Sequence, residues 1–398
     1  MSRINDMLLK FGSIGRNEDR SITRPGNSEA YWQALQAVRE EMGRLGLETD
    51  VDPVGNLHGY LPGSVPEKKS IVMGSHLDTV INGGLFDGML GVVGAMEVVA
   101  RLRERGITLQ HPLEVFGFNF EEGGPLGGTF GSRCVSGMLS PETPGLAEKL
   151  RACGMKPADV AASRRDISRY ACYLEYHIEQ GDYLDMNQLD IGVVSGIVGI
   201  VRYTVTAVGM SNHAGTTMMS GRRDALVAMS RLIVAADQKA RELSDTLVFT
   251  VGKISVSPGQ ENVIPGECTA TFEFRHMEKD VTDAFFEAIR KIASEISGCT
   301  FHFVNTARKY ATVCDPVLME AVSSSAEELG ARHVVMPSGA GHDAAALAHE
   351  GVSIGMIFVP SVAGISHHGK EMTEERHVEL GADVLFETVR KLDRMITD

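Results

Sequence analysis

Apolar residues recur at steps of three and four positions over 28–45, which is the spacing of one buried face of a helix. Ser28 stands where its side chain can cap the start of that helix. Two short apolar runs follow at 70–75 and 113–120, and each leads straight into a cluster of polar residues. A helix rich in small apolar residues is predicted between them, over about 91–105. This alternation predicts a mostly parallel sheet that is covered by helices.

The pattern changes in the middle of the chain, where a strand with period-two alternation appears. The predicted order there is strand, helix, strand, strand, helix and strand, which is that of a ferredoxin-like β-α-β-β-α-β unit. Because this block has a complete topology of its own, we expect a second domain inserted into the first. Its predicted elements are 202–209, 223–243, 246–257, 267–275, 281–296 and 300–305.

The α/β pattern resumes after that block and ends on a helix that runs to the C-terminus. The elements before this last helix are predicted at 316–329, at 333–336, after Gly341 and at 355–360. We therefore predict an α/β catalytic domain formed by residues 1–200 and 312–398, interrupted by a lid-like domain over 201–311.

Composition and charge exclude several classes of protein. The chain has 398 residues, which suits two or three domains of roughly 150 residues each. Its 38 basic and 52 acidic residues give a net charge of −14, which argues against nucleic-acid or membrane-surface partners. No run of about 18 apolar residues and no N-terminal signal pattern occurs, so neither a membrane span nor secretion is expected. The six scattered cysteines fit free thiols in a reducing compartment, and we expect a cytoplasmic protein.

Candidate metal ligands stand where ligand chemistry collects in such a sheet, at the carboxyl ends of strands. His76 and Asp78 come after the first predicted strand, and Glu121 and Glu122 come after the second. Further candidates are Asp87, His177 and His367. Imidazoles together with carboxylates suit zinc, manganese, cobalt or nickel. One glutamate of the pair could bind a metal ion while its neighbour acts as a general base.

Each of these residues also has a simpler interpretation. A single histidine such as His76 or His177 is more often a core or surface residue, and two adjacent glutamates are often a solvated pair in a loop. Asp78 could cap the helix that follows it. Spacing alone leaves both interpretations open.

Six motifs then occur in an order that is typical of one enzyme family. They are GSHLDTVINGGLFDG, EEG, YHIEQG, SNHAGTT followed by RRDAL, SGAGHDA and GISHHGKE. From about residue 28 to the C-terminus, the chain resembles the N-carbamoyl-L-amino acid and allantoate amidohydrolases. These enzymes are a branch of the dinuclear metallopeptidase superfamily that includes aminoacylase. The resemblance implies a metallohydrolase catalytic domain and an inserted lid that also forms a homodimer.

The resemblance also implies two divalent ions per subunit, which would be Zn²⁺, Mn²⁺, Co²⁺ or Ni²⁺. Asp87 would bridge these ions. The other ligands would be His76, Glu122, His177 and His367. Asp78 would accept the second ring N–H of His76 and so fix its orientation. Glu121 would be the general base that takes a proton from water and later gives one to the leaving nitrogen.

Residues of the lid and of nearby loops are expected to hold the small-molecule substrate. His213 would donate a hydrogen bond to the oxyanion in the active site of a partner subunit. Asn262 and Arg275 would bind the carboxylate of the substrate, and Gln180 and the backbone around Gly364 would make further contacts. His213 could instead be a turn residue, and Arg275 a surface charge at the end of a strand.

The chain departs from the pattern of the family at three places. The loop Gly123–Gly128 replaces an Arg-Phe pair that members commonly carry after Glu-Glu-Gly. The run TTMM at 216–219 replaces a proline-methionine pair, and Gly369 stands where a proline often follows the last ligand. None of these positions is a predicted ligand or base, so the departures bear on the substrate and leave the reaction unchanged.

These observations predict a metal-dependent amidohydrolase that cleaves a linear C–N bond in a small carboxylate-bearing substrate. An N-carbamoyl-L-amino acid is the first choice, with the amino acid, CO2 and ammonia as products. Allantoate is second, and an N-acyl amino acid or dipeptide is third. A homologue that binds without catalysis would lack a ligand or the base, whereas here all six positions are filled.

Overall fold

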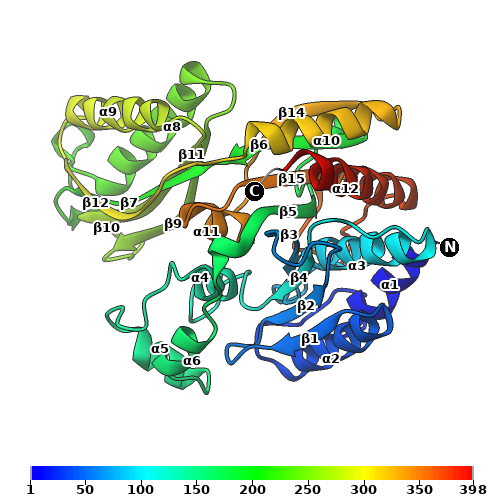
Figure 1. Ribbon diagram of the computed structural model, residues 1–398. Helices are drawn as coiled ribbons and strands as arrows, with labels where there is room; N and C mark the ends of the chain where they lie inside the picture. The colour runs from blue at the N-terminus through cyan, green and yellow to red at the C-terminus, as the bar shows by residue number, and fades with distance from the viewer. Residues whose placement is uncertain (1, 397–398) are drawn as a thin grey trace. The chain divides into compact units, whose positions relative to one another are not determined.

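The computed structural model describes residues 2–396, which adopt a mixed α/β fold (Figure 1). The larger sheet contains β1 (Glu48–Val51), β2 (Leu57–Leu61), β3 (Ser70–His76), β4 (Leu113–Phe118), β5 (Tyr170–Ile178), β6 (Ile191–Ile197), β13 (Thr312–Val313), β14 (His333–Ser338) and β15 (Ile354–Val359). The strand order is β1-β2-β4-β3-β5-β15-β6-β13, and β14 pairs with β6. The central strands β4, β3, β5 and β15 run parallel. The expected α/β class with a mostly parallel central sheet is therefore confirmed.

Helices cover both faces of this sheet because its central strands are apolar on both sides. All seven residues of β3 are buried. Ile71 and Met73 pack in one cluster with α3 (Met89–Glu104) and α12 (Glu375–Met395). Val72, which points to the other face, packs in a second cluster that includes α11 (Asp343–His349). The alternation of side chains along β3 thus places one helical layer on each face.

The helix expected over 28–45 is α2 (Glu29–Arg44), and the Ser28 hydroxyl accepts the Tyr31 N–H at 3.1 Å where this helix begins. The other helices of this part are α1 (Arg3–Gly12), α4 (Phe130–Ser136), α5 (Leu146–Ala152), α6 (Pro157–Ala162), α7 (Tyr183–Met186) and α10 (Pro316–Glu328). Of these, only α10 was predicted from the sequence. Within residues 2–396, no helix is both long enough and apolar enough to cross a membrane.

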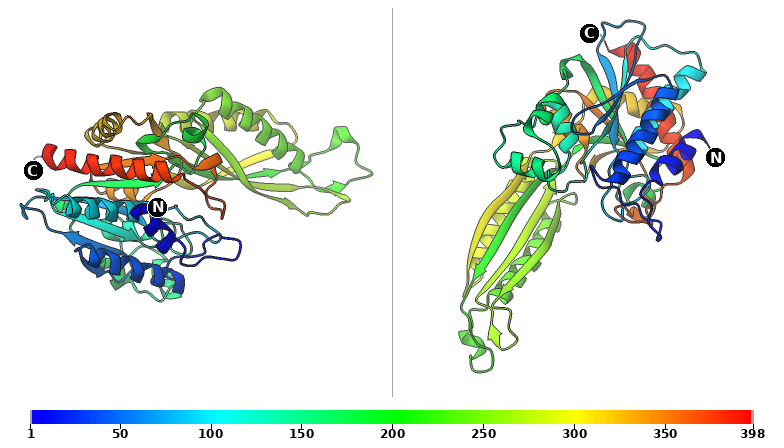
Figure 2. Two further views of the ribbon diagram at one scale, coloured as in Figure 1. Left: turned by 90° about the vertical axis from the view of Figure 1, so that its right-hand side faces the viewer. Right: turned by 90° about the horizontal axis from the view of Figure 1, so that it is seen from below.

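The chain divides into two compact units. One holds the described residues up to Ile197 and from Val313 onward, and the second spans Val198–Thr312. The elements of the second unit are β7 (Gly199–Val208), β8 (Asn212–His213), α8 (Ala225–Leu243), β9 (Val248–Ser257), β10 (Val263–Ile264), β11 (Glu267–His276), α9 (Lys279–Glu295) and β12 (Thr300–Lys309). Its four-stranded antiparallel sheet has the order β12-β7-β11-β9, and α8 and α9 pack on one face (Figure 2). That this unit acts as a lid and a dimerisation domain stays a prediction.

Asp190 ties the start of β6 to β14 and α12. Its carboxylate accepts hydrogen bonds of 3.0–3.1 Å from the backbone and guanidinium N–H groups of Arg332, and it lies 3.3 Å from Nε2 of His377. Burial opposes ionisation, but the hydrogen bonds from Arg332 outweigh it and lower the pKa of Asp190 to about 2. Because the pKa is depressed in the folded state, this carboxylate stabilises the fold at neutral pH, and the stabilisation is lost as the pH falls from about 4 to about 2.

We expect Asp190→Asn to lower the free energy of unfolding by about 1–2 kcal/mol at pH 7 and by about half as much at pH 3. The estimate is reduced because the Arg332 side chain is 52% exposed and therefore screened by solvent. Urea unfolding of both proteins at the two pH values measures the difference. Asp237→Asn, which removes an exposed ion pair with Arg241, is the control and should matter little at either pH. If Asp190→Asn lost the same free energy of unfolding at pH 7 and at pH 3, the stabilisation would not depend on ionisation of Asp190.

Candidate metal centre and active site

Four neighbouring strands of the larger sheet bring the candidate ligands together. In the order β4-β3-β5-β15, their carboxyl ends lie at one edge of the sheet. His76 is the last residue of β3, His177 is next to last in β5, and Glu122 follows β4. Asp87 lies in the turn before α3, and His367 lies in the loop after β15. His76, Asp87 and His177 are buried, whereas the His367 side chain is 48% exposed.

The ligand atoms form two groups that share one carboxylate. His76, Asp87 and His177 make up one group, Asp87, Glu122 and His367 make up the other, and the atoms of each group lie within 4.8 Å of one another. Asp87 Oδ1 is 3.5 Å from Nε2 of His76 and 3.2 Å from Nε2 of His177. Asp87 Oδ2 is 3.1 Å from Nε2 of His367, which is itself 3.2 Å from Oε2 of Glu122. Each oxygen of Asp87 therefore faces a separate group.

The donor atoms in these groups fit divalent cations. Nδ1 of His76 and Nδ1 of His177 lie 2.9 and 2.8 Å from backbone carbonyl oxygens, which only accept, so both Nδ1 atoms carry the proton. In the neutral rings, both Nε2 lone pairs then face the same carboxylate oxygen of Asp87, an arrangement that a cation between them would stabilise. Oε1 of Glu122 is buried and has no hydrogen-bond partner among the described residues. Nitrogen and oxygen donors of this kind suit Zn²⁺, Mn²⁺, Co²⁺ or Ni²⁺.

Glycine is required where the chain passes beside His76. Gly88 has a φ of +67°, and a Cβ at this position would lie 2.3 Å from Nδ1 of His76. No other residue fits both the left-handed backbone and this close approach. The glycine next to Asp87 in the sequence thus lets the shared carboxylate come close to the histidine.

Asp78 holds the loop after β4 in place. Its Oδ1 accepts the backbone N–H of Glu121 at 3.1 Å, and its Oδ2 accepts that of Glu122 at 3.2 Å. The expected hydrogen bond from His76 to the Asp78 carboxylate is replaced by one to the Asp78 backbone. Nδ1 of His76 donates to the backbone carbonyl of Asp78, and the carboxylate Oδ1 lies 3.9 Å from this ring nitrogen. Burial, opposed by His76 and reinforced by Glu122, raises the pKa of Asp78 to about 6. Asp78 therefore orients both glutamates through their backbone.

Glu121 belongs to neither ligand group, but it precedes Glu122 in the sequence and its charge acts on His76. Burial, together with the charges of Asp343, Glu122 and Asp78, raises its pKa well above the ordinary value, against the opposing charge of His76. A raised pKa makes a carboxylate a stronger proton acceptor than an ordinary glutamate, which suits a general base. Such a group next to the proposed ligands is suited to proton transfer.

Gln180 follows β5, and Gly364 ends a short 3-10 helix (Val362–Gly364) in the segment after β15. Nε2 of Gln180 donates to Oδ2 of Asp87 at 3.0 Å, so its amide contacts the shared carboxylate. Gly364 has a φ of +65°, and a Cβ there would lie 2.9 Å from Cβ of Asp182. Both residues are therefore fixed by close contacts with their neighbours.

Three candidates lie in the second unit. His213 pairs with Val263 across β8 and β10, and the N–H of the residue after it donates to the carbonyl of Asn262 at 3.0 Å, so His213 and Asn262 are neighbours. Nδ1 of His213 accepts backbone N–H groups at 3.0 and 3.2 Å, which leaves the proton of the neutral ring on Nε2. Arg275 on β11 forms an ion pair with Glu273, with nitrogen–oxygen distances of 2.9 and 2.7 Å.

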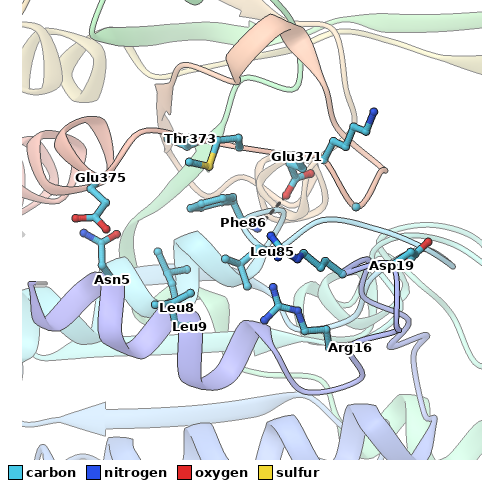
Figure 3. A pocket seen from close by; sticks show the side chains of 14 residues that line it. Asn5, Leu8, Leu9, Arg16, Asp19, Leu85, Phe86, Glu371, Thr373 and Glu375 are labelled. Atoms are coloured by element: carbon cyan, nitrogen blue, oxygen red, sulfur yellow. Dashed lines mark hydrogen bonds between the residues drawn. The ribbon is translucent and has the colours of Figure 1, made fainter.

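Glu371 is a buried carboxyl group in contact with the candidate site that the sequence did not single out. Its Oε1 accepts the backbone N–H of Phe86 at 2.9 Å and that of Asp87 at 3.1 Å, while Oε2 accepts the Ser366 hydroxyl at 2.9 Å. Figure 3 shows its carboxylate turned towards Phe86. Burial and the charge of Asp87 raise the pKa of Glu371 to about 7. Glu371 thus positions the turn that carries the shared carboxylate, and its place in GISHHGKE is the one sequence signal that could have found it.

A layer of buried polar residues lies beside the first group. Glu175 on β5 accepts the Ser75 hydroxyl and the Ala344 N–H, both at 2.9 Å. The His342 ring lies 4.7 Å from the His177 ring, and its Nε2 is 2.8 Å from the hydroxyl of Ser338. The motif SGAGHDA therefore packs against a candidate ligand.

Fold and site together are those of a metal-dependent α/β hydrolase. The sequence profile of peptidase family M20/M25/M40 matches residues 72–391, which is most of the chain. The chain therefore belongs to this family, and the resemblance inferred from its motifs is confirmed.

Similar proteins extend over nearly the whole chain. The N-carbamoyl-L-amino acid amidohydrolase of Geobacillus stearothermophilus is 35% identical over 402 residues, which cover 98% of each chain. The allantoate amidohydrolase of Bacillus subtilis (strain 168) is 36% identical over 405 residues, which cover 98% of this chain and 97% of the relative. A solved hydantoinase/carbamoylase family amidase from Burkholderia ambifaria is 29% identical, with a TM-score of 0.89 and coverage of 100% of this chain and 98% of that chain.

Proposed function

We propose that this chain hydrolyses the linear C–N bond of an N-carbamoyl-L-amino acid and releases the amino acid, CO2 and ammonia. The observation that carries the proposal is the pair of histidine–carboxylate groups that share Asp87. Relatives with this activity in their names, 35% identical over the full length, support it.

Each group would hold one divalent ion, and the bound ions supply a Lewis acid that polarises the carbonyl and lowers the pKa of water. Glu121 takes a proton from the attacking water as the new C–O bond forms. It then passes a proton to the leaving nitrogen as the first C–N bond breaks, and the carbamate that remains loses CO2 as its own C–N bond breaks, which releases the second amine. Asp78 keeps Glu121 in place through the backbone hydrogen bond described above.

Residues of the second unit would bind the rest of the substrate. Nε2–H of His213 is free to donate to the oxyanion, because backbone groups occupy Nδ1. The guanidinium of Arg275, together with Asn262, would bind the carboxylate, since an arginine fork matches a carboxylate. Gln180 and the backbone at Gly364 would complete the binding site.

Arg275→Ala is expected to raise KM about 10-fold or more and to change kcat little, because the lost charge binds the substrate equally before and during the reaction. Steady-state ammonia release measures both constants. The matched control is Arg202→Ala, which removes the other arginine that pairs with Glu273. If KM is unchanged in Arg275→Ala for every substrate that is turned over, this residue does not bind the carboxylate.

We further propose a homodimer in which each active site uses the His213 of the partner subunit. Glu121→Gln and His213→Ala should each be inactive alone. Mixed under conditions that exchange subunits, they should regain about a quarter of the wild-type turnover, because half of the dimers contain one complete site. Persistent inactivity of a mixture shown to contain the mixed dimer would mean that His213 acts within its own subunit.

Allantoate is the second candidate substrate, because the allantoate amidohydrolase of Bacillus subtilis is 36% identical. The deciding experiment measures ammonia release from N-carbamoyl-L-methionine and from allantoate with EDTA-treated protein and after Mn²⁺ is restored. Metal-dependent turnover of the first compound alone is the expected result. Turnover of allantoate alone would replace the proposal, and no ammonia from either, with two ions verified by elemental analysis, would indicate N-acyl amino acids or dipeptides.

A further inference from the structure

A cavity of about 580 Å³ opens beside Glu122 in the first unit. It is bounded by the loops that follow β3 and β4 and by the end of α5. Apolar and weakly polar side chains make up most of its wall, which includes Val80, Ile81, Phe120, Pro125, Ala152 and Cys153. Ile81 is 70% exposed although it is large and apolar, so its side chain is available to a ligand.

Apart from Glu122, the polar side chains in this wall have hydrogen-bond partners. Asn27 donates to the carbonyl of Cys153 at 2.9 Å and accepts the indole N–H of Trp32 at 3.0 Å. The hydroxyl of Thr79 accepts the Arg24 N–H and donates to a backbone carbonyl, both at 2.9 Å. Similar hydrogen bonds engage the side chains of Ser28 and Asp78. Apart from Glu122, a proposed metal ligand, these side chains leave little for a polar ligand to bind, so the cavity favours an apolar one.

The loop that departs from the family pattern leaves this space open. Gly123 and Gly124 have φ values of +108° and +87°, which favour glycine. A Cβ at Gly124 would meet nothing within 4 Å. The loop therefore contributes no side chain to the cavity before Pro125.

We propose that this cavity receives the side chain of the substrate amino acid and makes the enzyme selective for N-carbamoyl-L-amino acids with large apolar side chains. The inference rests on the proposed function, in which the ions held by the two ligand groups, one of which includes Glu122, act on the carbonyl of the scissile bond. A second ureido arm, as in allantoate, would lose its hydrogen bonds to water on entering and find few in return. A charged side chain would be rejected for the same reason.

The test compares kcat/KM for N-carbamoyl-L-methionine, N-carbamoyl-L-alanine and N-carbamoyl-L-aspartate with the Mn²⁺-loaded protein. The methionine compound should exceed the alanine compound about 10-fold or more, and the aspartate compound should be the poorest. Ala152→Trp, at an exposed position in the wall, should bring the methionine-to-alanine ratio close to one by filling the cavity. Ala158→Trp, exposed on α6 and outside the wall, is the matched control and should keep the wild-type ratio.

The outcomes separate the inference from the proposed function. Hydrolysis of the alanine and methionine compounds at equal rates, or an unchanged ratio in Ala152→Trp, would overturn the inference while the amidohydrolase activity stands. No hydrolysis of any N-carbamoyl amino acid by the metal-loaded wild type would overturn both.

Discussion

Glu121→Gln is expected to lower kcat by about 10²–10⁴-fold while both divalent ions stay bound. Glutamine keeps the size of the side chain and removes its ability to take a proton from water. Glu121 is in neither ligand group, so the ions should not depend on its charge. Ammonia release gives the turnover, and elemental analysis of the purified variant gives the metal content.

The matched control for Glu121→Gln is the same substitution at the next residue. Glu122→Gln alters the adjacent carboxylate, which belongs to the second group, and should lose one of the two ions. If Glu121→Gln kept both ions and full turnover, another group would have to be the base. If it lost an ion, Glu121 would be a ligand.

The second large effect is expected at Asp87, because its two oxygens face both ligand groups. Substitution of a residue that hydrogen-bonds to a metal ligand typically weakens metal binding 10- to 100-fold, and Asp87→Asn should weaken the binding of both ions by more than that. Activity at micromolar metal should therefore disappear. Titration of the metal-free protein with Mn²⁺ measures the affinities. A variant that keeps both ions would show that Asp87 is not shared.

A graded series makes this result specific. His367→Ala should lose one ion, because His367 is in one group only. His368→Ala changes the next residue, which is exposed and is in neither group, and should keep both ions. If His368→Ala also lost metal, the loss in His367→Ala could be an effect of changing the loop, and it would not identify His367 as a ligand.

Local patterns predicted much of the first unit. The run at 70–75 is β3, and the polar residues after it meet those after β4 because parallel strands end at the same edge of the sheet. The bounds of α2 followed from its apolar spacing and its serine cap. These features depend on residues that are close in the sequence, so one sequence is sufficient to predict them.

Interactions between distant segments were not predictable in this way. Glu371 accepts hydrogen bonds from the backbone of Phe86 and Asp87, which precede it in the sequence by 285 and 284 positions. No spacing rule connects segments that are so far apart. The orientation of His76 depends on a backbone carbonyl, which any residue type at position 78 would supply. The short helices α4–α6 have too few turns for their apolar periodicity to stand out.

The interrupted first unit has a consequence for synthesis of the protein. His367 follows His177 by 190 residues, and the second unit lies between them. At about 5–20 residues per second, a ribosome needs roughly 10–40 s to add that stretch. The central sheet cannot be completed before β15 emerges, because β15 pairs with both β5 and β6. The second unit is continuous in sequence, so in the nascent chain the inserted unit can mature before the unit that contains it.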